Sequence, residues 1–284
     1  MSDRRVGEHG SAHSGAHELV ALVPLLCDPA SREPLHPREE HGQSFLVSSP
    51  SGRRFPIRDG IPCFLEDADS TGSRGRYRRL FDRIARLLDL STWLHAGLAQ
   101  PRDSARRRES LRRLEIREGS RVLEVSVGTG ANLGLLPPNT WYFGLDASWE
   151  RLRRCRQRGA RHGLAPELFQ GAAESLPFRD GVFDSVFHLG GMRFFSDRAR
   201  AVAEMVRVAK PATRIIIVDE TGDHGDRSEG IKTPTDLLPP GMREVETRLL
   251  AGWESHCLSF RTPPERVGTS HRAVGGMDNS APLA

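Results

Sequence analysis

Strand-like and helix-like segments alternate along the second half of the chain, and this alternation constrains its fold most strongly. Short apolar runs such as RVLEVS (121–126), WYFGLDAS (141–148) and TRIIIVDE (213–220) are separated by segments with helical periodicity. Such alternation favours a parallel sheet with helices on both faces. The last two strands, at 243–252 and 255–263, follow each other without a helix, so we expect an antiparallel edge hairpin. The predicted fold is α/β, with a seven-stranded, doubly wound, Rossmann-like sheet.

The spacing of apolar residues predicts five helices in the part of the chain from residue 75 onwards. Those at 131–136, 148–162 and 197–208 connect strands of the sheet. Two more, at 75–90 and about 103–114, precede the first strand and are rich in arginine. Their basic faces could hold RNA phosphates, but a solvent-exposed helix face is the simpler interpretation.

A smaller α+β unit precedes the sheet, within residues 18–66. We expect a short apolar helix at 19–26, turn-rich sequence after it, and two strands, QSFLVSS (43–49) and RRFPI (53–57), joined by a turn at 50–52. A unit of this size can bury only a small core, so we expect it to dock on the rest of the chain.

The chain is therefore expected to divide into four segments. A disordered tail covers residues 1–17, the small unit covers 18–66, the main domain covers 75–263, and a second disordered tail covers 264–284. Both tails lack hydrophobic periodicity, which is typical of chain that cannot bury enough apolar surface to fold.

The positive charge of the chain invites a nucleic-acid interpretation that its composition weakens. The formal net charge is +4 and the isoelectric point is about 9.2. Lysine occurs only at Lys210 and Lys232, so arginine supplies nearly all the positive charge, a bias more typical of a GC-rich genome than of a phosphate-binding surface. No apolar run approaches the roughly 18 residues of a membrane helix, and the N-terminus has no signal-peptide core. We expect a cytoplasmic protein without membrane contact.

Cysteine usage predicts neither a disulfide framework nor a metal centre. The four cysteines, Cys27, Cys63, Cys155 and Cys257, form no C-x-x-C pair. Zinc requires about four clustered ligands, and no such cluster surrounds any of these cysteines in the sequence. We expect four free thiols and no bound metal.

The segment RVLEVSVGTGANLGLL (121–136) joins a strand to a paired-glycine turn, which lets a ligand approach bare backbone. Gly128 and Gly130 fit a dinucleotide fingerprint, but Leu133 occupies its third glycine position. A phosphate-binding P-loop requires a lysine, and none is near. The turn therefore argues against a phosphate ligand.

Two carboxylates next to the turn further limit the class of ligand that can bind there. Asp146 ends the second strand, where a carboxylate can accept both ribose hydroxyls of a nucleoside. Glu124 lies inside the first strand, where it either pairs with an arginine or meets a positively charged ligand such as an ammonium or sulfonium. Together they favour a positively charged nucleoside over NAD.

Five segments in order resemble the class I S-adenosylmethionine-dependent methyltransferases, in the subgroup that includes quinone-biosynthesis enzymes. VLEVSVGTGAN resembles the first motif, GLDAS the second, and LFQGAAESLPFRDGVFD the stretch that holds adenine. FDSVFHLGGMRFF and EMVRVAKPATRIIIVDE resemble the fourth- and fifth-strand segments. The likeness runs from about residue 77 to 263 and implies S-adenosyl-L-methionine as the cofactor.

The resemblance also implies which residues surround the cofactor. The glycine motif would frame the methionine moiety and ribose, the second motif would bind the ribose hydroxyls, and the third would lie against adenine. His188 would sit at the mouth where the methyl group leaves sulfur, and His188 and Arg193 would line the acceptor pocket. The implied cofactor-binding residues are Glu124, Ser126, Gly128, Gly130, Asn132, Asp146, Ala147, Ser148, Ala173, Glu174 and His188.

The chain departs from the family pattern in two places that bear on function. Family members often have an acid at the position of Ala172, so its contact with the adenine amino group is lost or supplied by Glu174. The segment between Asp219 and Leu237 is short for a substrate cap.

The N-terminal unit has a resemblance of its own. LVPLLCDPASREPL and RRFPIRDGIPCFL are similar to the small zinc-ribbon-like protein that activates tRNA and translation-factor methyltransferases. The zinc-binding form would need a second cysteine near Ala30, which is absent. We interpret the unit as a metal-free copy that serves packing or substrate presentation.

The leading hypothesis is an enzyme that methylates a small molecule, such as a secondary metabolite or a quinone-like compound. An RNA or protein methyltransferase is the first alternative, motivated by the basic helices and the activator-like segment. A cofactor-binding scaffold without activity is the second, motivated by Ala172 and by the short cap segment. His188 is either a general base or a packed histidine, so no catalytic residue is assigned. The acceptor, the methylated atom and the oligomeric state do not follow from the sequence.

Overall fold

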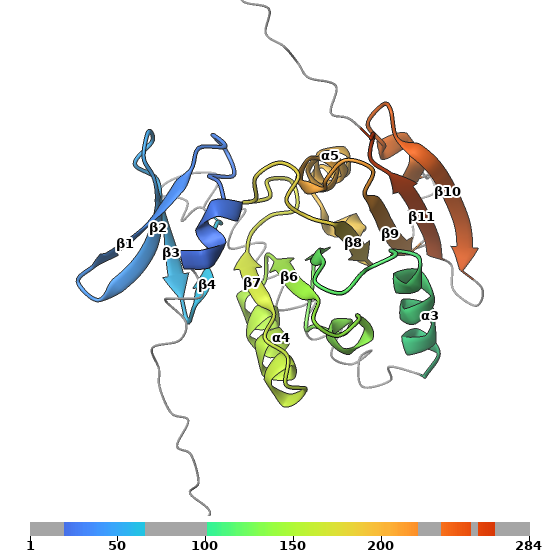
Figure 1. The fold of residues 1–284 in the computed structure, drawn as a ribbon, viewed down its shortest axis with the longest axis horizontal. Helices are drawn as coiled ribbons and strands as arrows, with labels where there is room; N and C mark the ends of the chain where they lie inside the picture. The colour runs from blue at the N-terminus through green and yellow to red at the C-terminus, as the bar shows by residue number, and fades with distance from the viewer. Residues whose placement is uncertain (1–19, 66–100, 221–233, 251–254, 265–284) are drawn as a thin grey trace, which may run out of the picture.

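The computed structural model describes residues 20–65, 101–220, 234–250 and 255–264. Both expected tails and the expected helix at 75–90 lie outside these residues. Within them the chain forms a large mixed sheet with helices and a small antiparallel sheet beside it (Figure 1).

The large sheet has seven strands in the order β10-β11-β9-β8-β5-β6-β7. β5 to β9 run parallel to their neighbours, whereas β11 is antiparallel to both β9 and β10. The expected doubly wound sheet with an antiparallel edge hairpin is therefore confirmed. The strands are β5 (Arg121–Val125), β6 (Trp141–Asp146), β7 (Glu167–Gln170), β8 (Ser185–Leu189), β9 (Arg214–Glu220), β10 (Arg243–Leu250) and β11 (Ser255–Arg261).

Among the described residues, three α-helices accompany this sheet: α3 (Pro101–Arg112), α4 (Trp149–Arg161) and α5 (Arg198–Val208). All three were expected within about two residues of these bounds. α4 and α5 begin where a side chain can cap them, because Ser148 accepts a hydrogen bond from Arg151 N and Asp197 accepts one from Arg200 N.

The predicted helix at 131–136 is wrong. The segment forms only a short 3-10 turn, η2 (Leu133–Leu135). Gly134 lowers helix propensity inside the segment, and Pro137 and Pro138 directly after it cannot continue a helix. The strand β5 is therefore followed by a compact loop and not by a crossover α-helix.

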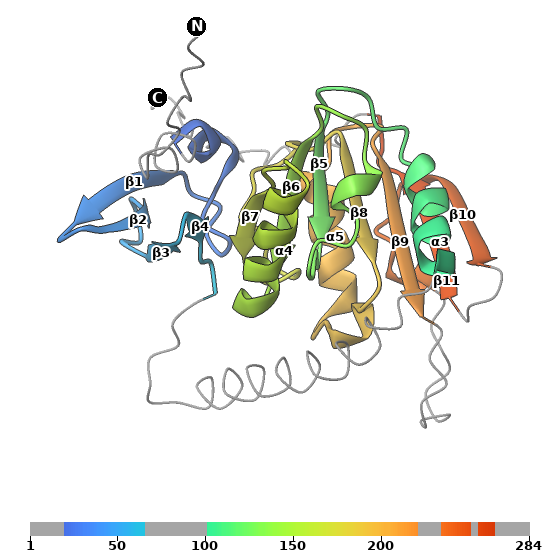
Figure 2. The same cartoon turned by 90° about the horizontal axis from the view of Figure 1, so that it is seen from below.

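Helices cover both faces of the sheet (Figure 2). Val122 of β5 packs in one buried cluster with Leu111 of α3 and Leu152 of α4. The next residue, Leu123, belongs to the other cluster, with Met205 of α5. Successive side chains of a strand point to opposite faces, so α3 and α4 cover one face and α5 covers the other.

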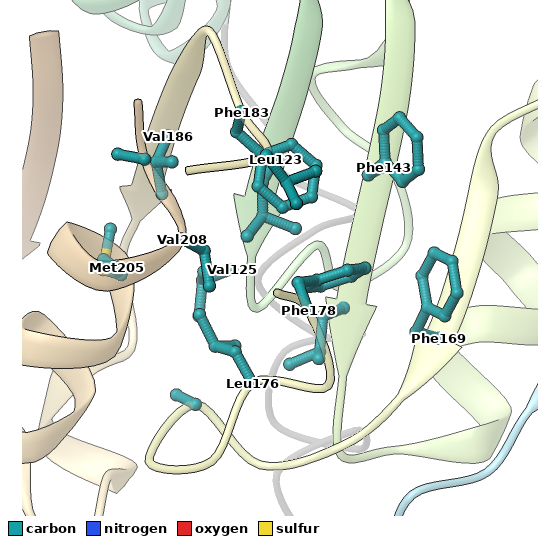
Figure 3. Close-up of a cluster of buried hydrophobic side chains, with 14 of the residues drawn as sticks. Leu123, Val125, Phe143, Phe169, Leu176, Phe178, Phe183, Val186, Met205 and Val208 are labelled. Carbon is teal, nitrogen blue, oxygen red and sulfur yellow. The ribbon is translucent and has the colours of Figure 1, made fainter. Parts of the chain in front are cut away.

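Four phenylalanines form the centre of the core on the α5 face (Figure 3). Phe178 meets Phe183 with ring centroids 4.9 Å apart and Phe169 at 5.0 Å, both edge-on, and Phe143 lies 5.2 Å from Phe183. Edge-to-face packing suits the aromatic quadrupole and adds to the free energy of burial. Phe178 lies in the loop between β7 and β8, so this loop is part of the core.

The small sheet has four antiparallel strands in chain order, β1 (Leu35–Glu40), β2 (Gln43–Ser48), β3 (Arg54–Arg58) and β4 (Ile61–Pro62). It is preceded by the 3-10 turn η1 (Val23–Leu25). The predicted strands β2 and β3 and the turn between them are confirmed. β1 was expected as turn-rich sequence, and it is a strand with five of its six residues exposed, so it carries no hydrophobic alternation that would reveal it.

The small sheet and the large sheet share one hydrophobic core. Leu26 of the N-terminal segment forms a β-bridge with Phe178, and its N-terminal neighbour Leu22 belongs to the same buried cluster as Leu176. At the other end of the unit, Cys63 forms a parallel bridge with Gln170 of β7. The unit therefore packs against the β7 side of the large sheet (Figure 1).

A buried carboxylate joins the same two parts of the chain. Glu204 of α5 is 6% exposed and accepts hydrogen bonds from Arg32 at 2.6 Å, from Arg207 at 2.8 Å and from Leu176 N at 2.9 Å. Arg32 also donates to the carbonyl oxygen of Leu176. One side chain thus connects the N-terminal unit, helix α5 and the core loop.

Replacing Glu204 with alanine is expected to lower the free energy of unfolding by about 3 kcal/mol, because Leu176 N and two guanidinium groups lose a buried acceptor. Urea unfolding followed by circular dichroism measures the change. The control is Glu109→Ala, which removes an exposed pair with Arg113 and should cost less than about 0.5 kcal/mol. Equal losses in the two variants would contradict a structural role for Glu204.

Candidate functional site

The carboxyl ends of β5, β6 and β8 lie side by side at the point where the order of the strands in the sheet reverses. From β5 the chain proceeds to β6 and β7 on one side, and it then returns to β8 and β9 on the other. Ligands of open α/β sheets bind at such a switch point. The predicted residues Glu124, Asp146 and His188 lie at or next to the ends of these three strands.

The glycine turn after β5 has three residues in the left-handed region. They are Ser126 with φ 63°, Gly128 with φ 57° and Gly130 with φ 75°. A side chain at Gly130 would meet Leu133 at 2.7 Å and Cys155 at 2.8 Å, whereas a side chain at Gly128 would meet nothing within 4 Å. A glycine at position 130 is thus required for packing against α4. The open space in which a ligand could lie is next to Gly128. Ser126 adopts its φ at a cost on the order of 1 kcal/mol.

Asp146 connects the end of β6 to this turn. Its Oδ2 accepts a hydrogen bond from Gly128 N at 2.9 Å, and its Oδ1 accepts one from Ser148 N at 2.9 Å. The residue is 5% exposed. The neighbouring carbonyl of Ala147 accepts a hydrogen bond from the side chain of Gln170. The carboxylate is therefore held in place by backbone donors on both sides.

Glu124 is buried on the α3–α4 face of the sheet. Its two oxygens accept hydrogen bonds from Asn132 Nδ2 at 2.7 Å and from the hydroxyl of Tyr142, and Arg107 of α3 donates to Asn132 Oδ1 at 3.2 Å. The pKa of Glu124 is raised to about 8, chiefly because burial disfavours its charged form, and the nearby charge of Asp146 adds to this. The Asn132 hydrogen bond and the charge of Arg107 offset only part of the rise.

Two members of this network belong to no motif in the sequence. Glu124 was expected to pair with an arginine or a ligand, and instead it contacts Tyr142 and Asn132, with Arg107 one step further away. A buried acid needs hydrogen-bond partners. Tyr142, which has a hydroxyl group and lies on the next strand, could therefore have been predicted as a partner of Glu124. Nothing local connects Arg107 to the site, because the packing of α3 determines which of its arginines faces the turn.

His188 at the end of β8 is fully buried, and so it does not lie at an open mouth. Its Nδ1 is 2.9 Å from the carbonyl oxygen of Val125, and its ring lies 5.0 Å from that of Phe195. A carbonyl only accepts, so Nδ1 carries the hydrogen and Nε2 is an acceptor. Nε2 is buried and has no partner among the described residues. Burial lowers the pKa of His188 to about 4, so the ring is neutral near pH 7.

The remaining predicted residues lie on the loops beyond β7 and β8. Ala173 is buried, and Oε1 of Glu174 accepts hydrogen bonds from Ser196 N at 2.7 Å and from Ser196 Oγ at 2.8 Å. Glu174 therefore ties the two loops together. Arg193 is exposed, and its guanidinium lies 4.7 Å from the ring centroid of Phe194, which is 39% exposed.

The described residues also bear on metals and membranes. They include no group of three or more histidine, cysteine or acidic residues that could hold a metal ion. All four cysteines are buried and free. None of the helices in the described part of the chain is long and apolar enough to cross a membrane.

The residues of this site lie within a segment that matches a known protein family. Residues 123–217 match the family described as "Methyltransferase domain". The matched range starts in β5 and ends in β9, so it includes the glycine turn, Asp146 and His188.

Three known proteins illustrate the similarity. A phosphatidylethanolamine N-methyltransferase of Cereibacter sphaeroides is 35% identical over 48% of this chain and 64% of its own. A demethylmenaquinone methyltransferase of Bacillus cytotoxicus is 30% identical over 51% of this chain and 64% of its own. The crystal structure of the YcgJ protein of Bacillus subtilis is 31% identical over 41% of this chain and 51% of its own, with a TM-score of 0.39. The chain spans less than two thirds of the length of each of these proteins.

The buried acid Glu124 predicts how stability depends on pH. The carboxyl has its ordinary pKa in the unfolded chain and a pKa of about 8 when folded, so between about pH 5 and pH 8 only the folded state retains the proton. This carboxyl therefore makes the free energy of unfolding fall as pH rises through that window.

Glu124→Gln, which resembles the protonated acid, should remove this part of the pH dependence. Urea unfolding at pH 5.5, 7 and 8.5 measures it, and the variant should gain stability relative to the wild type at each step upward. Parallel pH profiles for the two proteins would show that Glu124 is ionised in the folded state.

Proposed function

We propose that this protein transfers the methyl group of S-adenosylmethionine to a small-molecule acceptor, a proposal that starts from the match of residues 123–217 to the family described as "Methyltransferase domain". The observation that supports the cofactor assignment most directly is the pairing of Asp146 with Gly128 N at the switch point of the sheet. It places a buried carboxylate beside a turn whose backbone can be approached closely.

The site fits the nucleoside part of this cofactor. Gly128 has open space where a side chain would be, so a ligand can lie directly on the turn. A carboxylate oxygen has two acceptor directions, so the oxygens of Asp146 that already accept from backbone N–H groups can also accept from ribose hydroxyls. Ser148 and Ala147 continue the edge of the site beyond the ribose position.

The site also fits a ligand with a positive charge. Glu124 and Asn132 lie side by side within the network behind the glycine turn, and Ser126 lies between Glu124 and Gly128 in the chain. In the proposed complex Glu124 faces the ammonium group of the methionine moiety. A cation within about 4–6 Å lowers the pKa of a carboxyl, so Glu124 would lose its proton when the ligand binds.

The acceptor side of the site is built from the end of β8 and the loop after it. When bound, the cofactor supplies a methyl group activated by its sulfonium centre. His188 is fully buried, so its proposed role is to hold the end of β8 against Val125 through its hydrogen bond, and not to contact the acceptor. Arg193 and Phe194 offer an exposed cation and an exposed aromatic ring for the remainder of the acceptor.

A small-molecule acceptor is favoured over RNA or protein. The similar proteins named above are called methyltransferases of phosphatidylethanolamine and of demethylmenaquinone, which are small molecules. The arginines on α4 could bind RNA, but Arg153 and Arg154 pair with Glu150, and Arg156 pairs with Asp59. These two carboxylates offset part of the positive charge of α4. A non-catalytic scaffold is the remaining alternative.

Calorimetric titration of S-adenosylmethionine and S-adenosylhomocysteine tests the cofactor assignment. Asp146→Asn should weaken binding about tenfold or more, since a charged acceptor for two hydroxyls is lost. Glu246→Gln on the far edge of the sheet is the control and should bind as the wild type does. Equal affinities for wild type and Asp146→Asn would refute the assignment. Transfer of labelled methyl to lipid extract and not to tRNA then identifies the acceptor class, and no transfer to either favours the scaffold.

Proton release on cofactor binding tests the role of Glu124 separately. At pH 7 a carboxyl with a pKa of about 8 is mostly protonated, so binding of the ammonium group should release nearly one proton. Titrations in two buffers with different ionisation enthalpies measure the number released. Glu124→Gln should release none, and equal release by both proteins would exclude Glu124 as the partner of the ammonium.

A further inference from the structure

The two edges of the large sheet differ in what covers them. At the β7 edge the N-terminal unit adds a strand-like segment, in which Phe64 N donates to the carbonyl of Gln170 at 2.7 Å. At the opposite edge β10 pairs with β11 on its inner side, and no strand among the described residues lies on its outer side (Figure 1). An edge strand presents unpaired N–H and C=O groups, so it is a template for another strand.

β10 is long and open to solvent. Seven of its eight residues are exposed, and they include two large apolar side chains, Val245 at 43% and Leu249 at 66%. A β-bulge with Glu244 at φ 48° separates its beginning from the regular ladder that runs from Glu246 to Leu250. The carboxylate of Glu244 is already paired with Arg214 and Arg261. The stretch that can accept a partner strand therefore consists of Val245, which directly precedes the regular ladder, and the ladder residues 246–249.

The sequence of this stretch, V-E-T-R-L, is complementary to itself when read in the opposite direction. We propose that β10 pairs antiparallel with β10 of a second copy of this chain, about a two-fold axis through Thr247. In this register Thr247 faces Thr247 of the second copy, Glu246 faces Arg248, and Val245 faces Leu249. The Glu246–Arg248 and Val245–Leu249 pairs each occur twice because the two-fold axis repeats them, whereas the Thr247–Thr247 pair lies on the axis and occurs once.

The charges of Glu246 and Arg248 favour this register over the two registers in which the axis is shifted by one residue. Moving the axis by one residue to Glu246 or to Arg248 would place that charged residue opposite itself, which destabilises a strand pair. In the proposed register each Glu246 lies opposite an Arg248 of the other copy. Within one chain these two side chains already pair at 3.3 Å, so the dimer would hold a four-membered ring of alternating charges.

The packing on the two faces of the edge agrees with this arrangement. Thr247 is opposite Leu258 of β11, which belongs to the core on the α5 face, and Arg248 is opposite Cys257, which belongs to the core on the α3–α4 face. The charged pairs therefore lie on the α3–α4 side of the joined sheet. Leu249 lies on the α5 side with Thr247, and the pairing buries it against Val245 of the other copy.

Sedimentation velocity over a concentration series tests whether the dimer forms. The wild type should pass from its monomer mass of 31.5 kDa towards twice that value as concentration rises. A stretch of five residues forms a small interface, so the association is expected to be weak and concentration-dependent. A protein that stays monomeric up to several hundred micromolar overturns the proposal.

A charge-swap series tests the register. Glu246→Arg places Arg opposite Arg twice and should weaken association about tenfold or more, and Arg248→Glu should do the same. The double variant, Glu246→Arg with Arg248→Glu, restores opposite charges in every pair and should associate like the wild type. All three changes are at exposed positions, and circular dichroism verifies folding. Wild-type association in both single variants, or failure of the double variant to recover, overturns this register.

A cysteine scan locates the two-fold axis. Thr247→Cys places a thiol opposite its own copy, at the spacing of directly paired residues, so mild oxidation should give a covalent dimer. The native cysteines are all buried and should not react. The matched control is Arg248→Cys, which lies opposite Glu246 and should cross-link far less. Cross-linking that is equal at both positions, or absent at Thr247→Cys, overturns the assignment of the axis.

Discussion

The hydrogen bonds of Asp146 organise the site more than any other interaction. A carboxylate that is almost fully buried must be met by donors, and two donors that meet it are backbone N–H groups, from Gly128 in the glycine turn and from Ser148 at the start of α4. The side chain that ends β6 thus fixes the turn after β5 and the entry to the next helix. Because Ser148 also caps α4, a short stretch of the chain determines the positions of one strand end, one turn and one helix start.

The second buried acid, Glu124, differs from Asp146 in the groups that bind it. Glu124 is bonded by side chains and not by backbone, and burial keeps it protonated near neutral pH. Such an acid lowers the free energy of unfolding as pH rises. A role in ligand binding explains its position in the core better than a role in packing does. His188 is likewise a buried polar side chain with an energetic cost. Its hydrogen bond to Val125 holds one ring nitrogen, and the other nitrogen is buried without a partner among the described residues.

The N-terminal unit is part of the same core as the large sheet. Leu26 pairs with the loop that carries Phe178, and Glu204 binds an arginine from each part. This arrangement protects the β7 edge of the sheet and stabilises the loop between β7 and β8. Seven of the eight residues of β10 are exposed, and their order along the strand is what allows a second copy to cover this edge.

The sequence by itself determined the sheet, its strand directions and most helix ends, because alternating apolar runs, N-capping side chains and the glycine turn are local signals. It also placed Asp146 at the end of the second strand and Glu124 inside the first, whereas the position of His188 was only implied by the family resemblance. It missed β1, which has no apolar alternation, and it predicted a helix at 131–136 that Gly134, Pro137 and Pro138 prevent.

Only the tertiary structure decided which groups meet across elements. The contacts of Glu124 with Tyr142 and Asn132, the orientation of Glu174 towards Ser196 and the burial of His188 depend on strand register and helix packing, which no local pattern encodes. The same holds for Glu204 and Arg32, which are 172 positions apart in the chain. Local patterns thus define the elements, and long-range packing defines the site between them.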